Sequence, residues 1–421
     1  MSQLLCPTTP IQTMTLASGL QVVYQYVPAA VVAIDFWVRA GAAAEPEDYN
    51  GVAHALEHMV FRGSADLPPG AFDQLIEGHG GMTNAATSQD YVHYYVLTSP
   101  EHWREALTAL ADILFRPDLD GSEWQRERAV ILEELRQAED HPDWVGQRQL
   151  WQYCYAGHPY ERPILGTAAS LARITPEVLQ HFHRQYYHPG NMTLVVVGAI
   201  PWEALMAVLA QVCPVAEAAD SAPAGVCPLP KVTPAYSRLH VPQAEQGRLW
   251  WVWPVTGVGD AATGWGLDLL ATILTGGRLA RLTQRLREEL GWVQDIDCHY
   301  HQQVAGGMWQ MTAWLSDDRR VEQVEAVLEQ ELMALQTELV SREELRRAQR
   351  QLLHAYTFGT ETPQQMAQVY GYYHAMGWLE QGMQYTQRLT QFCPEDLRTL
   401  AQMYLPPQPV VRLWLTPAEL G

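Results

Sequence analysis

The spacing of apolar residues in the first half of the chain predicts a sheet interleaved with helices. Apolar and polar residues alternate over 12–16, 19–27 and 31–40, and strand-like sequence returns over 82–97 and 192–197. Between these strands, apolar residues recur every three or four positions, as on one face of a helix. Helices are therefore predicted over 71–78, 100–115, 122–138, 144–153, 175–187 and 201–212.

The second half repeats this order of elements. Strands are predicted over 236–241, 248–254, 295–303, 307–315 and 410–415, and helices over 265–274, 279–290, 320–338, 342–356, 363–376 and 394–404. Residues 214–234 contain several prolines and little periodicity, which is typical of an interdomain linker. We therefore expect an internal duplication, with an N-terminal half over 1–213, a linker over 214–235 and a homologous C-terminal half over 236–421.

Composition limits the partners and the location that we expect. With 421 residues, 48% of them apolar, the chain is too long for one ordinary core and is globular. A formal net charge of −20 argues against binding to nucleic acid or to an anionic membrane. No apolar run is long enough to span a bilayer and no secretory signal is visible, so we expect a cytoplasmic protein. The six scattered cysteines form no C-x-x-C pair and are expected to be reduced thiols.

One short stretch, residues 54–58 (HALEH), carries candidate chemistry. If it is helical, with Asn50 as its N-cap, His54 and His58 lie one turn apart on one face and can share a metal ion. Glu57 emerges near that face, where it can take a proton from a water molecule held at the site. This is the inverted H-x-x-E-H arrangement of metallopeptidases. With fifteen histidines in the chain, an accident of composition is the alternative.

The phase of the predicted helix 122–138 indicates further ligand candidates. Glu127, Val130, Ile131 and Glu134 share one stripe, so two carboxylates lie on the face that carries apolar residues. Glu133 lies on a neighbouring, solvated stripe. Buried carboxylates are costly unless they are paired or bind a metal, so Glu134 and Glu127 are better candidates than Glu133. A structural ion pair with a buried arginine is the alternative.

Two other positions bear on the site. Asn84 follows the paired glycines at 80–81, where its amide could face a ligand, although it could equally be an ordinary turn asparagine. In the second half, the helix at 265–274 contains Asp268 and no histidine. Only the first half is therefore expected to hold a metal.

Several segments together resemble the pitrilysin family of zinc peptidases. They are residues 51–64 (GVAHALEHMVFRGS), 80–86 (GGMTNAA), 127–134 (ERAVILEE), 276–291 and 360–366 (TETPQQM). The similarity spans essentially the whole chain, and it is greatest to the branch that contains the mitochondrial processing peptidase subunits and short bacterial homologues. In this family the third zinc ligand is a glutamate 76 positions after the second histidine, which here is Glu134. Helix phase and family spacing select the same residue.

The resemblance implies a fold and a site. The fold is α+β, with two similar halves that enclose a chamber, each a mainly antiparallel sheet with helices packed on one face. Zinc is bound by His54, His58 and Glu134, with the fourth position left open for catalysis. Glu57 is the general base. Glu127 supports the site without binding zinc directly, and Asn84 holds the backbone of the substrate near the scissile bond.

One departure from the family bears on partners. Family members that complete catalysis carry an arginine and, seven residues later, a tyrosine, and both residues engage the substrate. Here the arginine is present as Arg287, but Gln294 replaces the tyrosine. The resemblance then implies a zinc-dependent endopeptidase of unfolded peptides that is the zinc-bearing subunit of a dimer, whose homologous partner supplies an Arg/Tyr pair. Alternatively, the glutamine suffices or Tyr300 substitutes. Rival functions are a non-catalytic scaffold subunit of the same fold and a zinc peptidase that is inactive without its partner.

Overall fold

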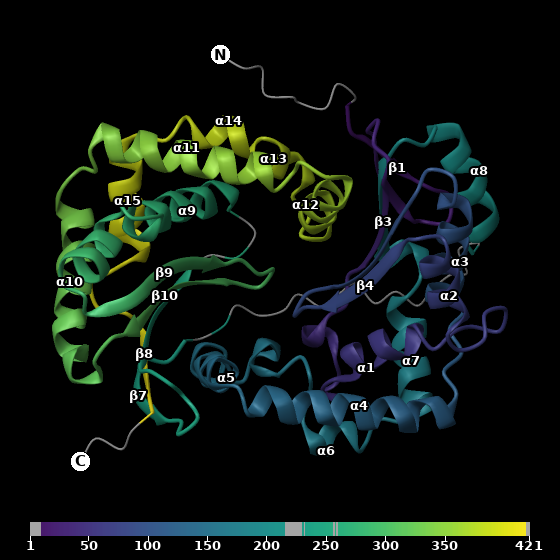
Figure 1. Ribbon diagram of the computed structural model, residues 1–421, viewed down its shortest axis with the longest axis horizontal. Coiled ribbons are helices and arrows are strands. Elements are labelled where there is room, and N and C mark those ends of the chain that lie inside the picture. The colour runs from purple at the N-terminus through teal and green to yellow at the C-terminus, as the bar shows by residue number, and fades with distance from the viewer. Residues whose placement is uncertain (1–9, 215–229, 231, 256, 258–259, 418–421) are drawn as a thin grey trace. The chain divides into compact units, whose positions relative to one another are not determined.

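The computed structural model describes residues 10–214, 230, 232–255, 257 and 260–417 (Figure 1). The chain forms two compact units, each assembled from separate segments of the sequence. Unit 1 contains residues 1–135, 162–225 and 359–379, and unit 2 contains 136–161, 226–358 and 380–421. Most of the predicted linker, residues 215–229 and 231, lies outside the described residues.

Unit 1 contains a six-stranded sheet. Its strands are β1 (Gln12–Thr15), β2 (Gln21–Tyr26), β3 (Val32–Val38), β4 (Met82–Thr87), β5 (Val92–Thr98) and β6 (Met192–Gly198). Their spatial order is β1-β2-β6-β3-β5-β4, and all neighbours are antiparallel except β2 and β6. The strand-like stretch predicted over 82–97 is therefore a hairpin of two strands, with β4 at the edge of the sheet.

Both faces of this sheet are covered. Every residue of β3 is buried, although successive side chains point to opposite faces. On one face, Trp37 and Val195 pack against Met366 and Ala367 of α12 (Pro363–Ala375). Helices of the first half cover the other. The first half contributes to unit 1 the helices α1 (Val52–Val60), α2 (Ala71–Gly78), α3 (Trp103–Phe115), α4 (Gly121–Glu139), α6 (Ala168–Leu171), α7 (Pro176–Tyr186) and α8 (Trp202–Val212), with short turns η1 (Ala42–Ala44), η2 (Glu47–Tyr49) and η4 (Pro189–Asn191).

Unit 2 contains a five-stranded sheet with the same topology. Its strands are β7 (Ala235–His240), β8 (Arg248–Val255), β9 (Val293–His301), β10 (Gly307–Leu315) and β11 (Val411–Thr416), in the order β7-β11-β8-β10-β9. This order matches β2-β6-β3-β5-β4 of unit 1 strand for strand, and β7 and β11 are the parallel pair. The shared topology confirms that the chain consists of two similar α+β halves.

The core of unit 2 lies between its sheet and a layer of helices. Trp251, Trp253 and Trp309 are fully buried there. Gly146 of α5 packs against Trp250 on the opposite face. The elements are α5 (Pro142–Cys154), α9 (Ala261–Thr275), α10 (Val321–Thr337), α11 (Arg342–Phe358), α13 (Leu379–Met383), α14 (Tyr385–Leu389), α15 (Pro394–Tyr404), and the short η3 (Pro159–Glu161), η5 (Thr283–Glu289) and η6 (Asp318–Arg320).

Two features differ from what the sequence predicts. The charged helix expected over 279–290 is largely a π-helix, η5, which amphipathic spacing alone does not distinguish from an α-helix. The units also differ from contiguous halves, because each sheet receives one helix from the other half of the sequence. Helix α12 belongs to unit 1 and α5 to unit 2 because the central strands are apolar on both faces and need a second cover.

Two predictions from composition can be compared with the described ranges. None of the helices there combines the length and the apolar character needed to cross a bilayer. The four cysteines in the same ranges, Cys154, Cys213, Cys298 and Cys393, are free thiols, as expected.

Candidate metal centre

Helix α1 begins differently from the prediction. The residue before its first turn is Gly51, with φ of +92°, so the predicted N-cap at Asn50 is wrong. The chain enters the helix through a left-handed conformation that glycine adopts without strain. A Cβ at position 51 would also lie 2.9 Å from the Cα of Gly166. The Asn50 amide instead donates to Glu45 Oε2 at 2.8 Å and to the Pro163 carbonyl at 3.2 Å.

Glu45 caps the helix from outside it. Its Oε2 accepts from the backbone N–H of Gly51 at 2.8 Å, and its Oε1 accepts from that of Ala53 at 2.9 Å. Burial raises the pKa of Glu45 to about 7, and the hydrogen bonds from Ala53, Gly51 and Asn50 offset this only in part. No local pattern in the sequence marks Glu45 as a cap, because it lies well before the helix, outside the spacing of any capping motif.

His54 and His58 converge on Glu134. Their ring centres are 4.7 Å apart, and the ring planes cross at 70°. Glu134 Oε2 is 3.7 Å from the Nε2 atom of each ring. An imidazole lone pair lies in the ring plane, so two planes that cross steeply allow one ion to lie in both. Tetrahedral zinc with bonds of 2.0–2.1 Å separates its ligand atoms by about 3.4 Å. The three side chains therefore fit a zinc ion after small adjustments.

The protonation of the two histidines differs. Burial, together with the charge of His58, lowers the pKa of His54 to about 4. Burial also acts to lower the pKa of His58, but hydrogen bonds with Glu127 and Glu134 outweigh it and raise the value to about 9. The hydrogen bond with His58 holds the pKa of Glu134 low. A metal entering this site would displace a proton from His58.

Glu127 contacts the ring nitrogen of His58 that faces away from Glu134. Its Oε2 lies 3.2 Å from His58 Nδ1, and its Oε1 lies 3.3 Å from Arg62 Nε. The hydrogen bond with His58 lowers the pKa of Glu127, so the carboxylate stays charged. A carboxylate in this position orients the imidazole and directs its Nε2 toward the metal position. The contact of Arg62 with Glu127 was not predicted from the sequence, although Arg62 lies only four residues after His58.

Helix α4 places its acidic residues as predicted from helix phase, but one apolar residue differs. Glu127 is only 6% exposed and Ile131 is fully buried, whereas Glu133 is exposed. Glu134 is half-exposed, which leaves the centre accessible from solvent. Val130 is 51% exposed and does not belong to the buried stripe.

Glu57 lies beside this cluster with a partner from the sheet. The Thr87 hydroxyl of β4 donates to Glu57 Oε2 at 2.5 Å. Burial raises the pKa of Glu57, and the charge of Glu134 acts in the same direction, against the lowering effect of the Thr87 hydrogen bond. A carboxylate with a raised pKa is a better proton acceptor. No sequence pattern indicated Thr87, which reaches Glu57 only because β4 passes α1.

Asn84 is on the opposite face of β4 from Thr87. The two residues are three positions apart, so their side chains alternate to different faces of the strand. Asn84 is exposed, and its Oδ1 accepts from the neighbouring Ala85 N–H at 2.9 Å. The structure does not bring Asn84 into the His–Glu cluster, and its substrate role stays a prediction.

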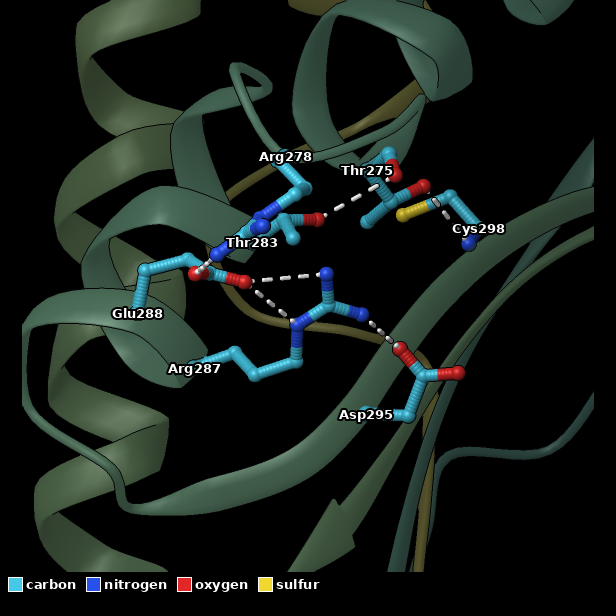
Figure 2. Close-up of polar contacts among 7 residues, drawn as sticks. All are labelled: Thr275, Arg278, Thr283, Arg287, Glu288, Asp295 and Cys298. Atoms are coloured by element: carbon cyan, nitrogen blue, oxygen red, sulfur yellow. Dashed lines mark hydrogen bonds and ion pairs between the residues drawn. The ribbon is translucent and has the colours of Figure 1, made fainter.

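Arg287 belongs to unit 2, where two carboxylates hold its guanidinium (Figure 2). Its Nε and Nη2 lie 3.1 and 3.0 Å from Glu288 Oε1, and its Nη1 lies 2.9 Å from Asp295 Oδ1. Gln294 is exposed on β9. Tyr300, considered above as a substitute for the missing tyrosine, is 7% exposed and packs in the core of unit 2.

Comparison with known families finds two family models that match successive parts of the chain. The family model described as Insulinase (Peptidase family M16) matches residues 21–168. This range includes His54, Glu57, His58, Glu127 and Glu134. The model described as Peptidase M16 inactive domain matches residues 173–352. The chain belongs to peptidase family M16. The M16 family includes the pitrilysin-type peptidases, so the resemblance predicted from the sequence is confirmed.

Individual M16 relatives match part of the chain. The uncharacterized zinc protease YmxG of Bacillus subtilis is 34% identical over 45% of this chain and 47% of its own length. A probable mitochondrial-processing peptidase subunit beta of Arabidopsis thaliana is 34% identical over 45% of this chain and 36% of its own length. These matches span less than half of each relative.

The fold extends over the whole chain. The crystal structure of a protease from Helicobacter pylori aligns with a TM-score of 0.86, covering 97% of this chain and 99% of that one at 22% identity. At that identity the likeness establishes the M16 fold.

Proposed function

We propose that this M16 chain is a zinc-dependent endopeptidase that cleaves unfolded peptides or short polypeptides. Zinc is held by His54, His58 and Glu134, and Glu57 is the general base. One observation carries the proposal: Glu134 Oε2 is 3.7 Å from both imidazole Nε2 atoms, with Glu57 on the same turn of α1. The names of relatives such as YmxG support zinc and proteolysis.

The chain's own groups divide the chemistry between them. A bound zinc ion would polarise the peptide carbonyl and make water more acidic. Glu57 removes a proton from the attacking water and returns it to the departing amine. The Thr87 hydroxyl, which donates to Glu57 Oε2, leaves Oε1 for that proton. Glu127 keeps His58 oriented throughout.

Strand β4 provides a place for the substrate. Among the described strands it pairs only with β5, so its other edge is open. An extended peptide can add to such an edge through backbone hydrogen bonds. Asn84, exposed on the face of β4 opposite Thr87, is predicted to contact the backbone of that peptide. Because only an extended segment can add as a strand, the substrates are unfolded.

The chain acts as the zinc-bearing subunit of a dimer. Gln294 stands where complete relatives carry a tyrosine, and Arg287 is neutralised by Glu288 and Asp295. A homologous partner with an intact Arg/Tyr pair would supply the missing substrate contacts. Some relatives are named as beta subunits of a processing peptidase, which supports this arrangement.

The test combines metal analysis with hydrolysis of a mixed peptide library. We expect about one zinc ion per chain at the centre and chelator-sensitive cleavage after co-purifying proteins are added. Glu57→Gln should lower kcat by about 10²–10⁴ and leave the zinc content unchanged. Glu133→Gln, an exposed glutamate on α4, is the matched control and should cleave normally.

Three results would contradict parts of the proposal. If the protein neither binds zinc nor cleaves peptides, the rival hypothesis of a non-catalytic scaffold subunit is favoured. Full activity of Glu57→Gln would remove the assigned base. Full activity of the purified homodimer would refute the need for a different partner.

A further inference from the structure

Strand β9 carries a second pair of histidines, in unit 2. Residues 295, 297, 299 and 301 share one face of the strand, and the alternate residues Ile296, Cys298 and Tyr300 face the core. The ring centres of His299 and His301 are 4.6 Å apart, and their planes cross at 72°. This is almost the geometry of the pair in the metal centre, at 4.7 Å and 70°.

The crossing angle decides which histidine clusters can chelate. Two imidazoles bind one ion well only if the ion lies near both ring planes, because the lone pairs lie in those planes. His79 and His102 lie close together beside Glu105, but their rings stack at 3.8 Å and 6°. The two rings are nearly parallel, so one of them must turn before a single ion can lie in both ring planes, although ligand atoms of His79, His102 and Glu105 lie within 4.8 Å of one another. The rings of His299 and His301 meet the requirement.

The strand offers one further candidate ligand beside the β9 pair. Asp297 lies two residues before His299 on the same face. Across the β9–β10 ladder, Gln310 lies opposite His299 and Met308 lies opposite His301, but both side chains are buried, and the Gln310 amide already hydrogen-bonds with Gln147 and Thr312. Residues directly opposite on neighbouring strands share a face of the sheet. His299 is exposed and His301 is partly exposed, so an ion can enter from solvent.

We propose that His299 and His301 bind a divalent late first-row transition ion, with Asp297 turning to supply a third ligand. Imidazole nitrogen suits copper, zinc and nickel, and Cu²⁺ binds most tightly in this series. None of the proposed ligands belongs to the zinc centre, which lies in unit 1. The inference is therefore independent of the proposed peptidase activity.

The test adds Cu²⁺ to the full-length chain after zinc has been loaded. We expect about one copper ion per chain, with the zinc retained, as measured by elemental analysis. The electron paramagnetic resonance spectrum should show coupling to two imidazole nitrogens. His299→Gln should reduce the coupling to one nitrogen, and His299→Gln with His301→Gln should abolish stoichiometric binding. Asp297→Asn should weaken it.

A matched pair of substitutions makes the result decisive. His79→Gln with His102→Gln removes the same number of surface imidazoles and should leave copper binding and its spectrum unchanged. The inference is overturned if the double variant on β9 still binds copper with the wild-type spectrum. It is also overturned if copper binds only as zinc leaves. Circular dichroism of each variant establishes that the chain is folded.

Discussion

Glu344→Gln is expected to loosen the segment that carries η5. Arg281, just before η5, donates from its Nε to Glu344 Oε1 at 2.7 Å and from its Nη2 to Oε2 at 3.2 Å. The backbone N–H of Ser341 donates to the same carboxylate at 2.9 Å. The two side chains are only about a fifth exposed, so solvent screens this pair less than a surface ion pair.

The expected magnitude follows from the pKa of Glu344. Burial acts to raise this pKa, but the hydrogen bonds from Arg281 and Ser341 outweigh it and lower the value from 4.5 to about 2. At about 1.4 kcal/mol per pH unit, the charged form stabilises the folded state by about 3 kcal/mol at neutral pH. Because the folded pKa lies below the unfolded one, this stability is present above pH 4.5 and is lost as the pH falls toward 2.

Hydrogen exchange followed by mass spectrometry measures this effect locally. At pH 7, amides of α11 and of residues 278–290 should exchange about a hundredfold faster in Glu344→Gln than in the wild type, since 1.4 kcal/mol is about a factor of ten. Glu343→Gln makes the same charge change on an exposed neighbour in the first turn of α11 and should have little effect.

A pH series tests whether the charge of Glu344 is the cause. The difference between the wild type and Glu344→Gln should shrink as the pH falls from 4.5 and should nearly vanish by pH 2. Equal exchange at pH 7, or a difference that stays constant down to pH 2.5, would show that the ion pair does not stabilise this segment.

Three other substitutions test the architecture of unit 1. Glu127→Gln should weaken zinc binding about 10–100-fold in a chelator competition, because His58 loses its charged partner. Glu45→Ala should speed hydrogen exchange across α1, because each buried helix amide left without an acceptor costs about 1–3 kcal/mol; unchanged exchange would exclude Glu45 as the cap. Gly371→Ala places a Cβ against Trp37 Nε1, so α12 should lose about 1–3 kcal/mol of packing and its amides should exchange faster.

The sequence predicted the elements of the site better than their contacts. Period and spacing place His54, Glu57 and His58 on a helix and Glu134 on the inner side of another, because regular helices fix which residues share a face. Amphipathic spacing likewise predicted most of the strands and helices. These features depend on neighbours along the chain, which a single sequence displays directly.

Contacts between distant segments were not predictable in this way. Glu45 caps α1 from a preceding turn, and Thr87 reaches Glu57 from a strand. The packing of α12 in unit 1 joins residues far apart in the sequence, such as Met366 and Val195. Each depends on the tertiary fold, so no local pattern marks it. The apolar character of β3 on both faces was a clue that its sheet needed a second cover.

Helix phase alone did not tell the two carboxylates of α4 apart; the family resemblance did, and the structure gives the physical reason. Helix phase selects both Glu127 and Glu134, but not their roles. His58 separates them, since its Nδ1 faces Glu127 and its Nε2 faces Glu134. The Nε2 atom of His54 also faces Glu134, so only Glu134 can complete a three-ligand set.

The surroundings of Arg287 sharpen the case for a partner. All three guanidinium nitrogens already contact Glu288 or Asp295 (Figure 2). To bind a substrate, Arg287 would have to give up at least one of these charged contacts, which costs free energy that a free arginine would not lose. Its companion position holds Gln294, which offers no phenol. The family's substrate clamp is thus weakened at both of its positions, while the three residues proposed to bind zinc are all present. A zinc-bearing chain that depends on a homologous partner accounts for both facts together.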